Sequence, residues 1–388
     1  MAKYKFEDIV YNITTKKKPV PEDKDLYVGL EHLDSGCLRV SRYGSDVVIN
    51  NEKLFMRKGD ILFGRRNAYL KRVAIAPHDG LFSAHGMIFR PKDVVLPEFL
   101  PFFIASDYFM EEAIKISVGS LSPTVNWGTL KELEFEIPEK DEQKKISDLC
   151  WSIEREQEAC MDALDAVMEL RSSYLDDLYS QKIRIRRDDG TLYPSWNTLQ
   201  LQDFADKLMR KNKNNETDLP LTISAADGLV DQRSFFNKTI ASKDMSNYYL
   251  LKRGEFAYNK SYSIGYPVGS VKRLDNYSEG ALSSLYICFT LKPGFNSDYI
   301  KYYFESTCWY NVVYKIVEEG ARAHGLLNVS KKAFFETEHM LSTDPEEQER
   351  IVENIKQFDR SIVDLKDKLE AIKKLKQAIL DERINENV

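Results

Sequence analysis

The sequence contains the same pattern twice, and this constrains its fold more than any other feature. The segment that begins Arg57-Lys-Gly-Asp-Ile-Leu returns 195 residues later as Lys252-Arg-Gly-Glu-Phe-Ala. Each copy leads to an acidic, glutamine-containing segment, and the two glutamines, Gln143 and Gln348, are 205 residues apart. A nearly constant offset indicates a duplication with short insertions. The chain of 388 residues therefore predicts two similar modules rather than one large core.

The predicted boundaries follow from the repeat: a first module at 1–138, a helix at 139–183, a second module at 184–342 and a second helix at 343–388. The net charge also differs between the modules and the helices. The first module is neutral, whereas 139–183 has twelve acidic and six basic residues. The net charge of −6 therefore comes from the helices, and the modules are neutral to mildly basic. This composition permits nucleic-acid binding without requiring it.

Short apolar stretches predict the strands of each module. Ile61-Leu-Phe, Val73-Ala-Ile-Ala and Met87-Ile-Phe follow one another in the first copy, and Phe256-Ala-Tyr and Leu285-Tyr-Ile-Cys-Phe-Thr correspond in the second. Helical spacing of aromatic and aliphatic residues follows at 97–116 and 297–317, where helices are expected to cover one face of the sheet. Each module is thus predicted to be a mixed α/β (α+β) domain.

The segments after each module carry an a/d heptad pattern. In the second, apolar residues recur at alternating spacings of four and three from Ile351 to Ile379, with Lys376 in the seam; the first keeps this register, with Arg171 at the equivalent position. Asp344-Pro345 with Glu347 predicts an N-cap, a first-turn proline and a capping-box acid. Helices of about 40 residues would be about 60 Å long and need a helical partner. Two pseudo-symmetric copies predict an antiparallel intramolecular coiled coil between the modules.

Motifs of catalysis, metal binding and membrane insertion are not found in the sequence. It has no phosphate-binding P-loop, nucleophile elbow or dinucleotide turn, and no Asn-Pro-Pro-Tyr-like element of an adenine methyltransferase. Its five histidines and five cysteines lack metal-ligand spacing, which predicts no metal site and reduced thiols. The absence of a signal-like or membrane-spanning stretch predicts a cytoplasmic protein.

Two loops in each copy are candidates for binding DNA. The first, 65–72, combines four cations with an amide and a phenol, and its counterpart is 259–266. Arg and Lys can bond guanine, Asn can pair with adenine, and Ser and Tyr can hold phosphates. The second, Gly119-Ser-Leu-Ser-Pro-Thr-Val-Asn-Trp, corresponds to Gly320-Ala-Arg-Ala-His-Gly-Leu-Leu-Asn. A basic loop without a partner and an ordinary connecting turn are the alternatives, and Lys16-Lys17-Lys18 is interpreted as a phosphate-attracting loop.

The predicted DNA-binding residues share donor groups or flat rings in these loops. They are Arg65, Arg66, Asn67, Tyr69, Lys71, Ser120, Ser122, Lys260, Ser261, Tyr262, Arg322 and His324.

Several motifs of this sequence, taken together with their order and their duplication, resemble those of the specificity subunit of a type I restriction-modification system. The resemblance rests on Lys58-Gly-Asp-Ile-Leu, on Phe135-Glu-Ile-Pro before Asp141-Glu-Gln-Lys-Lys-Ile, on Glu346-Glu-Gln-Glu-Arg-Ile and on Gly190-Thr-Leu-Tyr-Pro-Ser-Trp. The second copy departs from it with Gly254-Glu-Phe-Ala and with Met340-Leu-Ser-Thr-Asp-Pro.

The resemblance implies a non-catalytic chain whose two target-recognition domains each read half of a bipartite site in double-stranded DNA. Its helices would dock two methyltransferase subunits, restriction subunits would join them, and S-adenosylmethionine would bind the methyltransferase rather than this chain. The alternative from another class is a coiled-coil scaffold or inhibitor whose modules bind protein. A standalone nuclease or methyltransferase is disfavoured by the missing motifs.

Overall fold

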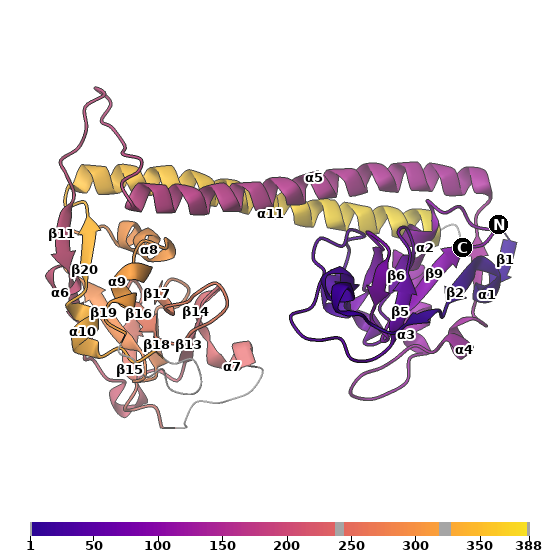
Figure 1. Cartoon of the computed structure of the whole chain (residues 1–388), viewed down its shortest axis with the longest axis horizontal. Helices are drawn as coiled ribbons and strands as arrows, with labels where there is room; N and C mark the ends of the chain where they lie inside the picture. The colour runs from indigo at the N-terminus through magenta and orange to yellow at the C-terminus, as the bar shows by residue number, and fades with distance from the viewer. Residues whose placement is uncertain (1, 237–243, 318–326, 386–388) are drawn as a thin grey trace. The chain divides into compact units, whose positions relative to one another are not determined.

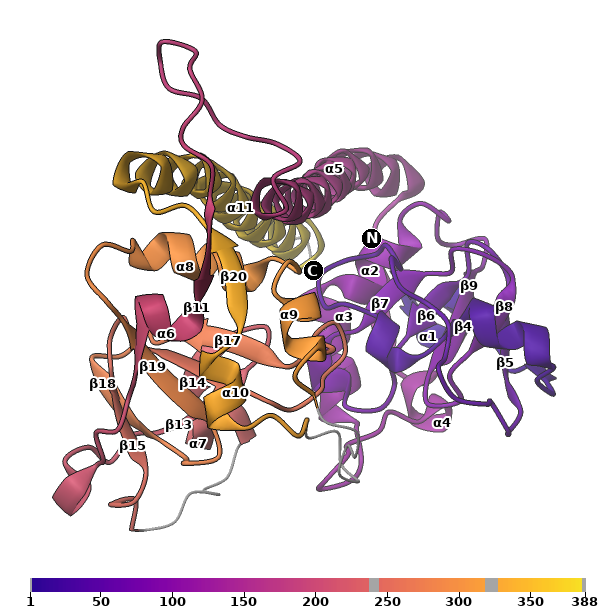
Figure 2. The same cartoon turned by 60° about the vertical axis from the view of Figure 1, so that its left-hand side comes forward.

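The computed structural model describes residues 2–236, 244–317 and 327–385. The chain forms two compact units. Unit 1 combines Met1–Asp165 with Val363–Val388, and unit 2 is Ala166–Ile362. Figures 1 and 2 show that each unit contains strands, short helices and parts of both long helices.

The elements of unit 1, before the long helices, follow the order expected of a strand-rich module. They are β1 (Ala2–Lys5), α1 (Phe6–Ile9), β2 (Val10–Ile13), β3 (Lys16–Lys17), η1 (Pro21–Leu26), β4 (Tyr27–Val28), η2 (Leu30–His32), β5 (Lys53–Met56), β6 (Ile61–Phe63), η3 (Ala68–Leu70), β7 (Val73–Ile75), β8 (Gly80–Phe82), β9 (Met87–Pro91), α2 (Leu100–Ala105), α3 (Asp107–Lys115), α4 (Trp127–Leu130) and β10 (Glu134–Ile137).

Unit 2 repeats this plan. Its elements are β11 (Asn197–Gln200), α6 (Leu201–Phe204), β12 (Ala205–Lys207), η4 (Lys213–Asn215), β13 (Pro220–Ser224), β14 (Gly228–Asp231), α7 (Gln232–Phe236), β15 (Tyr249–Lys252), β16 (Phe256–Asn259), β17 (Ser270–Arg273), β18 (Glu279–Leu282), β19 (Ile287–Leu291), α8 (Ser297–Glu305), α9 (Tyr310–Tyr314), α10 (Lys331–Phe335) and β20 (Glu338–Leu341).

The sheets of the two units have similar strand orders, but the mixed sheets differ at their edges, where β3 pairs with β5 in unit 1 and β14 pairs with β13 in unit 2. Unit 1 has an antiparallel sheet β2-β9-β6-β7, a mixed sheet β3-β5-β8-β4 and the pair β1-β10. The described residues of unit 2 form β12-β19-β16-β17, β14-β13-β18-β15 and β11-β20. In both mixed sheets one strand pair is parallel, β4 with β8 and β13 with β18. This correspondence confirms the predicted mixed α/β fold of two tandem repeats.

Aromatic side chains fill the space between sheet and helices in each unit. In unit 1, Phe6 of α1 packs against Phe89, Phe109 and Phe135 with ring centroids 5.0–5.9 Å apart. In unit 2, Tyr258 stacks on Phe334 at 4.5 Å. The strands predicted from continuous apolar runs, such as β6, are buried along their whole length. Large buried rings of this kind provide most of the apolar area that stabilises each core.

The repeated Gly-Asp/Glu motif is a turn with a carboxylate cap. Asp60 accepts a hydrogen bond from the backbone N–H of Arg57 at 2.8 Å, and Glu255 accepts one from Lys252 at 2.7 Å. The glycines before these acids have φ angles of 88° and 89°, which favour glycine. The motif that marks the repeat is therefore structural.

The helical patterns at 97–116 and 297–317 are each interrupted by a serine. Ser106 separates α2 from α3, and Ser306 follows α8. Their hydroxyls donate to the carbonyls of Phe103 and Tyr303 at 2.6 and 2.7 Å. A side chain that bonds the backbone three residues earlier competes with a continuous helix, so each pattern gives shorter helices.

The long helices are α5 (Lys140–Tyr179) and α11 (Pro345–Leu380), and α11 continues into η5 (Asp381–Asn385). In unit 1, Glu154 and Cys160 of α5 contact Lys376 and Leu365 of α11. In unit 2, Arg171 is 2.7 Å from Asp359. Because rising numbers on α5 meet falling numbers on α11 within each unit, the helices are antiparallel, as predicted.

The repeated glutamine joins each helix to its own module. Gln143 accepts from the N–H of Leu96 at 2.7 Å and donates to the carbonyl of Pro138 at 2.9 Å. Gln348 makes the equivalent bonds to Asn296 at 2.7 Å and Ser342 at 2.9 Å. Both glutamines are buried, and they fix the first turn of the long helix against the end of the last strand and against the loop before α2 in unit 1 and α8 in unit 2.

Asp344 caps α11 as predicted, but Glu347 does not complete a capping box. Asp344 accepts from the N–H groups of Glu346 and Glu347 at 3.0 and 3.2 Å. The carboxylate of Glu347 instead accepts from the indole of Trp196 at 3.0 Å and the hydroxyl of Ser342 at 2.5 Å. A buried carboxylate needs such donors, and Trp196 offers one that sequence spacing did not indicate. In the described part of the chain, every helix is too short or too polar to cross a membrane.

Candidate nucleic-acid interface

The two loops predicted in the first module meet in the structure. The N–H of Asn67 donates to the carbonyl of Pro123 at 2.7 Å, and the N–H of Val125 donates to the carbonyl of Arg65 at 2.9 Å. One guanidinium nitrogen of Arg66 lies 3.3 Å from the hydroxyl of Ser122. Segments 56 residues apart in sequence therefore form one surface, and the second of them projects between α3 and α4 (Figure 1).

The predicted residues of this surface differ in their exposure. Arg66, Tyr69 and Ser120 are exposed, and Tyr69 retains 55% of its accessible surface. Nε of Arg65 and Oδ1 of Asn67 are buried, and neither has a hydrogen-bond partner among the described residues. Asn67 adopts a left-handed conformation with φ of 55°, which turns the chain into η3. Arg66, Tyr69 and Ser120 are thus the predicted residues of this surface that are most available to a ligand.

Lys71 faces another part of unit 1. Its ammonium forms an ion pair with Asp107 at the start of α3. It also lines a small cavity of about 60 Å³ together with Lys376 and Leu380 of α11. The structure therefore does not group Lys71 with Arg66, and its role in DNA binding stays a prediction.

The corresponding surface of unit 2 has the same backbone link. The N–H of Leu327 donates to the carbonyl of Lys260 at 3.0 Å, as Val125 does to Arg65 in unit 1. The ammonium of Lys260 donates to the carbonyl of Val329 at 3.2 Å, and Tyr262 is 56% exposed. The backbone N–H of Ser261 donates to the side-chain oxygen of Asn259 at 3.0 Å. Arg322 and His324 lie outside the described residues.

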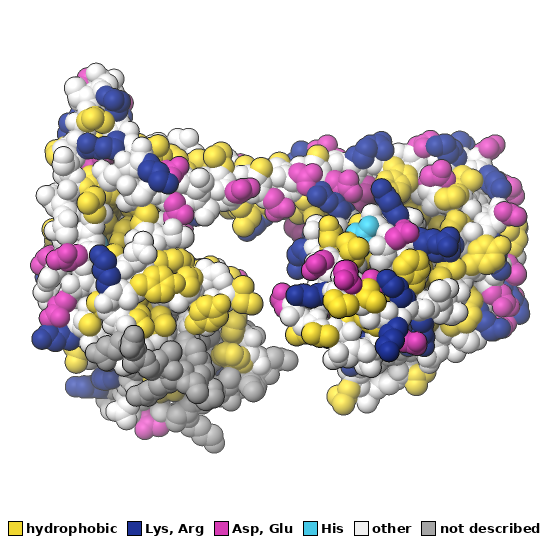
Figure 3. Space-filling view, in the orientation of Figure 1, with side chains coloured by type: hydrophobic (Ala, Val, Ile, Leu, Met, Phe, Trp, Pro, Cys, Tyr) yellow, Lys and Arg dark blue, Asp and Glu magenta, His cyan; other side chains and the backbone are white. Residues whose placement is uncertain are grey.

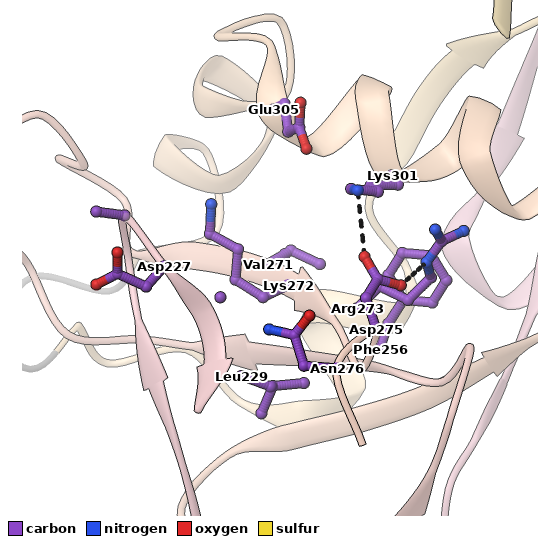
Figure 4. A pocket seen from close by; sticks show the side chains of 12 residues that line it. Asp227, Leu229, Phe256, Val271, Lys272, Arg273, Asp275, Asn276, Lys301 and Glu305 are labelled. Atoms are coloured by element: carbon purple, nitrogen blue, oxygen red, sulfur yellow. Dashed lines mark hydrogen bonds and ion pairs between the residues drawn. The ribbon is translucent and has the colours of Figure 1, made fainter. Parts of the chain in front are cut away.

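A polar cavity of about 260 Å³ in unit 2 was not anticipated from the sequence (Figure 4). Lys272 and Glu305 point into it from β17 and α8, and Lys301 pairs with Asp275 at 3.2 Å. Burial lowers the pKa of Lys272. The lining comes from four separate parts of the sequence, so no local motif could have indicated it. Across the described ranges, no three His, Cys, Asp or Glu side chains are grouped as a metal site requires.

The surface charge is mixed rather than segregated. On the face shown in Figure 3, Lys and Arg side chains alternate with Asp and Glu over unit 1 and the long helices. A strongly basic face would bind nucleic acid through phosphates alone. The face shown in Figure 3 has no such continuous basic area.

The sequence was compared with known protein families and the structure with solved structures. Residues 10–158 match the family model described as type I restriction modification DNA specificity domain. No curated protein matches the sequence.

Solved structures resemble the whole chain. One, from work on complex assembly and conformational transition of the type I R-M system, has a TM-score of 0.53 at 16% identity and covers 99% of this chain and 97% of that one. The HsdS subunit of Thermoanaerobacter tengcongensis has a TM-score of 0.42 at 18% identity, covering 100% and 97%. The S subunit of M. genitalium has a TM-score of 0.49 at 13% identity, covering 99% and 96%.

The solved structure with a TM-score of 0.53 shares the fold of tandem α/β modules with long helices. The sequence match adds that residues 10–158, which comprise most of the first module and the start of α5, are similar to a type I restriction modification DNA specificity domain. The resemblance to type I specificity subunits drawn from the sequence is thereby confirmed.

Proposed function

We propose that this chain is the non-catalytic specificity subunit of a type I restriction-modification complex and reads a bipartite site in double-stranded DNA. Each module contacts one half of the site through its two joined loops. Because the loops of the two copies differ in sequence, the half-sites differ too. Base recognition requires side chains on a rigid scaffold, and loops held by a sheet and helices meet that requirement.

The observation that carries this proposal is the joining of the two candidate loops in the unit whose sequence matches a DNA specificity domain. Arg66 is exposed there, beside Ser122. A guanidinium can bond guanine or phosphate, and the serine hydroxyl holds it in place. The cation is therefore positioned before DNA arrives, which lowers the entropy lost on binding.

The long helices would dock two methyltransferase subunits, with restriction subunits joining them. The acidic segment 139–183 is a poor ligand for DNA but suits a protein surface. S-adenosylmethionine would bind the methyltransferase, which would supply the methyl-transfer chemistry, and this chain requires no cofactor. The proposal assigns recognition to this chain and catalysis to its partners.

Methylome mapping of the host tests the proposal directly. It should return two half-sites separated by a fixed gap, and the full chain with its host methyltransferase should prefer this duplex in a binding competition at moderate salt. A complex with no sequence preference would refute the proposal and favour the protein-binding scaffold.

Arg66→Gln tests the loop within that assay. We expect a roughly tenfold weaker affinity, and a smaller salt dependence if Arg66 contacts phosphate. Lys115→Gln is the matched control, because Lys115 is an exposed cation of unit 1 that pairs with Glu112 on α3. Equal effects of the two substitutions would exclude a specific role for Arg66.

A further inference from the structure

The two most exposed large hydrophobic side chains in the described ranges lie in the candidate DNA-binding loops, one in each unit. Leu121 retains 95% of its accessible surface and Ile264 retains 89%. Exposed apolar side chains are common on proteins and usually need no explanation. Each of the two lies in a hydrogen-bonded turn within a candidate DNA-binding loop, whereas Leu285, which also lies in a hydrogen-bonded turn, is outside those loops.

The Leu121 turn, residues 118–124, is closed by the backbone. Val118 and Thr124 exchange two N–H to carbonyl hydrogen bonds of 3.0 Å each, and the hydroxyl of Thr124 donates to the carbonyl of Ser122 at 3.0 Å. These bonds hold Leu121 away from the apolar core of unit 1. The turn is thus ordered although its apolar tip packs against nothing.

The Ile264 turn, residues 263–266, has a similar design from a different part of its module. Ser263 and Tyr266 exchange hydrogen bonds of 3.3 and 2.8 Å. Gly265, the third residue of the turn, has a φ of 80°, as a type II turn requires at that position. Ile264 therefore occupies the second position of a tight β-turn.

Donor groups flank both tips. Ser120 and Ser122 are adjacent to Leu121, and Arg66 bonds Ser122. Lys260, Ser261 and Tyr262 precede Ile264 in the same loop. An apolar tip between cations and hydroxyls fits a DNA groove, where phosphates line the rim and base edges and thymine methyls line the floor.

We propose that Leu121 and Ile264 enter a groove of the target DNA and make apolar contact with base pairs, so that each contributes to sequence discrimination in its half-site. This inference rests on the proposed function and adds residues that carry no hydrogen-bonding group. Apolar side chains serve DNA recognition either by packing on a thymine methyl or by wedging into a base step. Both forms require an exposed apolar tip, and in both turns backbone hydrogen bonds present one.

The test compares Leu121→Ser and Ile264→Ser with Val48→Ser and Leu285→Ser in the full chain bound to its host methyltransferase. The control residues are 76% and 75% exposed and lie outside the candidate loops. Binding is measured by fluorescence competition on the mapped target and on an unrelated duplex. We expect the tip variants to bind the target on the order of tenfold more weakly, because burial of a leucine or isoleucine is lost. Binding to the unrelated duplex and thermal unfolding should not change.

Two modified targets identify the contact. Replacing thymine by uracil should weaken wild-type binding but not that of the tip variant if the side chain packs on the methyl. If the side chain wedges into a base-pair step, the fluorescence of a 2-aminopurine placed in the half-site should increase when wild type binds. It should not increase when the tip variant binds. Either result supports the inference.

The inference is overturned if the tip variants bind the target like wild type, or if they lose affinity without either signature. It is also overturned if the controls lose as much affinity. In each case a wild-type preference for the target would leave the proposed function intact. Absence of that preference in the wild type would instead refute the proposed function.

Discussion

Lys376 is the cation of the helical seam in unit 1, and its replacement should be the most destabilising single change in that pairing. Its ammonium donates to Glu154, Gln157 and the carbonyl of Gly36, each at 2.7 Å. Its side chain is 8% exposed and that of Glu154 is 1% exposed. Removing one partner of a buried ion pair leaves the other charge unpaired, which costs about 3–5 kcal/mol. Lys376→Met should therefore lower the free energy of unfolding of unit 1 by about that amount.

The control is Lys373→Met, the same substitution three residues earlier. Lys373 pairs with Glu370 at 2.9 Å, with side chains 34% and 63% exposed. Water and salt screen such a pair, so its loss should cost less than about 1 kcal/mol. Because both variants lose one charge from the same helix, the difference between them isolates burial.

Urea unfolding followed by circular dichroism and by limited proteolysis of unit 1 measures both values. A double-mutant cycle sharpens the result. Glu154→Gln keeps an acceptor for the N–H of Leu38, 3.0 Å away, while removing the charge. In the Lys376→Met background it should recover much of the lost stability. If Lys376→Met costs no more than Lys373→Met, or if Glu154→Gln gives no recovery, the attribution to a buried unpaired carboxylate is wrong.

Two further predictions concern buried polar groups. Burial lowers the pKa of His339 to about 3, against about 6.5 in an unfolded chain. The unfolded state thus binds more protons below pH 6.5, and unit 2 should lose about 2 kcal/mol of stability between pH 7 and pH 5. Urea unfolding at both pH values measures this, and His339→Gln should remove that part of the slope; an unchanged slope would contradict it. Gln143→Ala leaves the N–H of Leu96 without its acceptor at 2.7 Å, which should cost about 1–3 kcal/mol. It should also speed amide exchange at Leu96, whereas Gln357→Ala, at an exposed site on α11, should not.

The sequence predicted those parts of the fold that depend on local periodicity. Strands such as Ile61–Phe63 and Val73–Ile75 agree with their apolar runs. The heptads predicted two paired long helices, and the pseudo-symmetry of the two copies predicted that these helices are antiparallel. Periodicity could not show that Ser106 would divide a helical stretch, because that depends on one hydroxyl bonding the backbone. Nor could it show that the carboxylate of Glu347 would accept from Trp196 and not from the backbone N–H of the N-cap residue.

The candidate interface was predicted only in part, for a similar reason. The loops were found from their composition, but their joining depends on backbone bonds between Arg65 and Val125, distant in sequence. Lys71 has the same charge as Arg66 and turns toward Asp107 instead. The side chains of Leu121 and Ile264 carry no hydrogen-bond donor or acceptor, so the polar pattern that indicated the loops did not indicate these two residues.

Unit 1 consists of two segments that lie far apart in the sequence, and this affects the order in which the two units fold during synthesis. Leu380 and Ile384 belong to the same core cluster as Phe6 and Phe89, whereas unit 2 is one continuous segment. Val363 follows Asp165 by 198 residues, and ribosomes add about 5–20 residues per second, so the interval is about 10–40 s. During that time the earlier part of unit 1 exists without the strip of α11 that completes its core. The module translated first is therefore the last to finish folding, and chaperones have their longest opportunity to engage it.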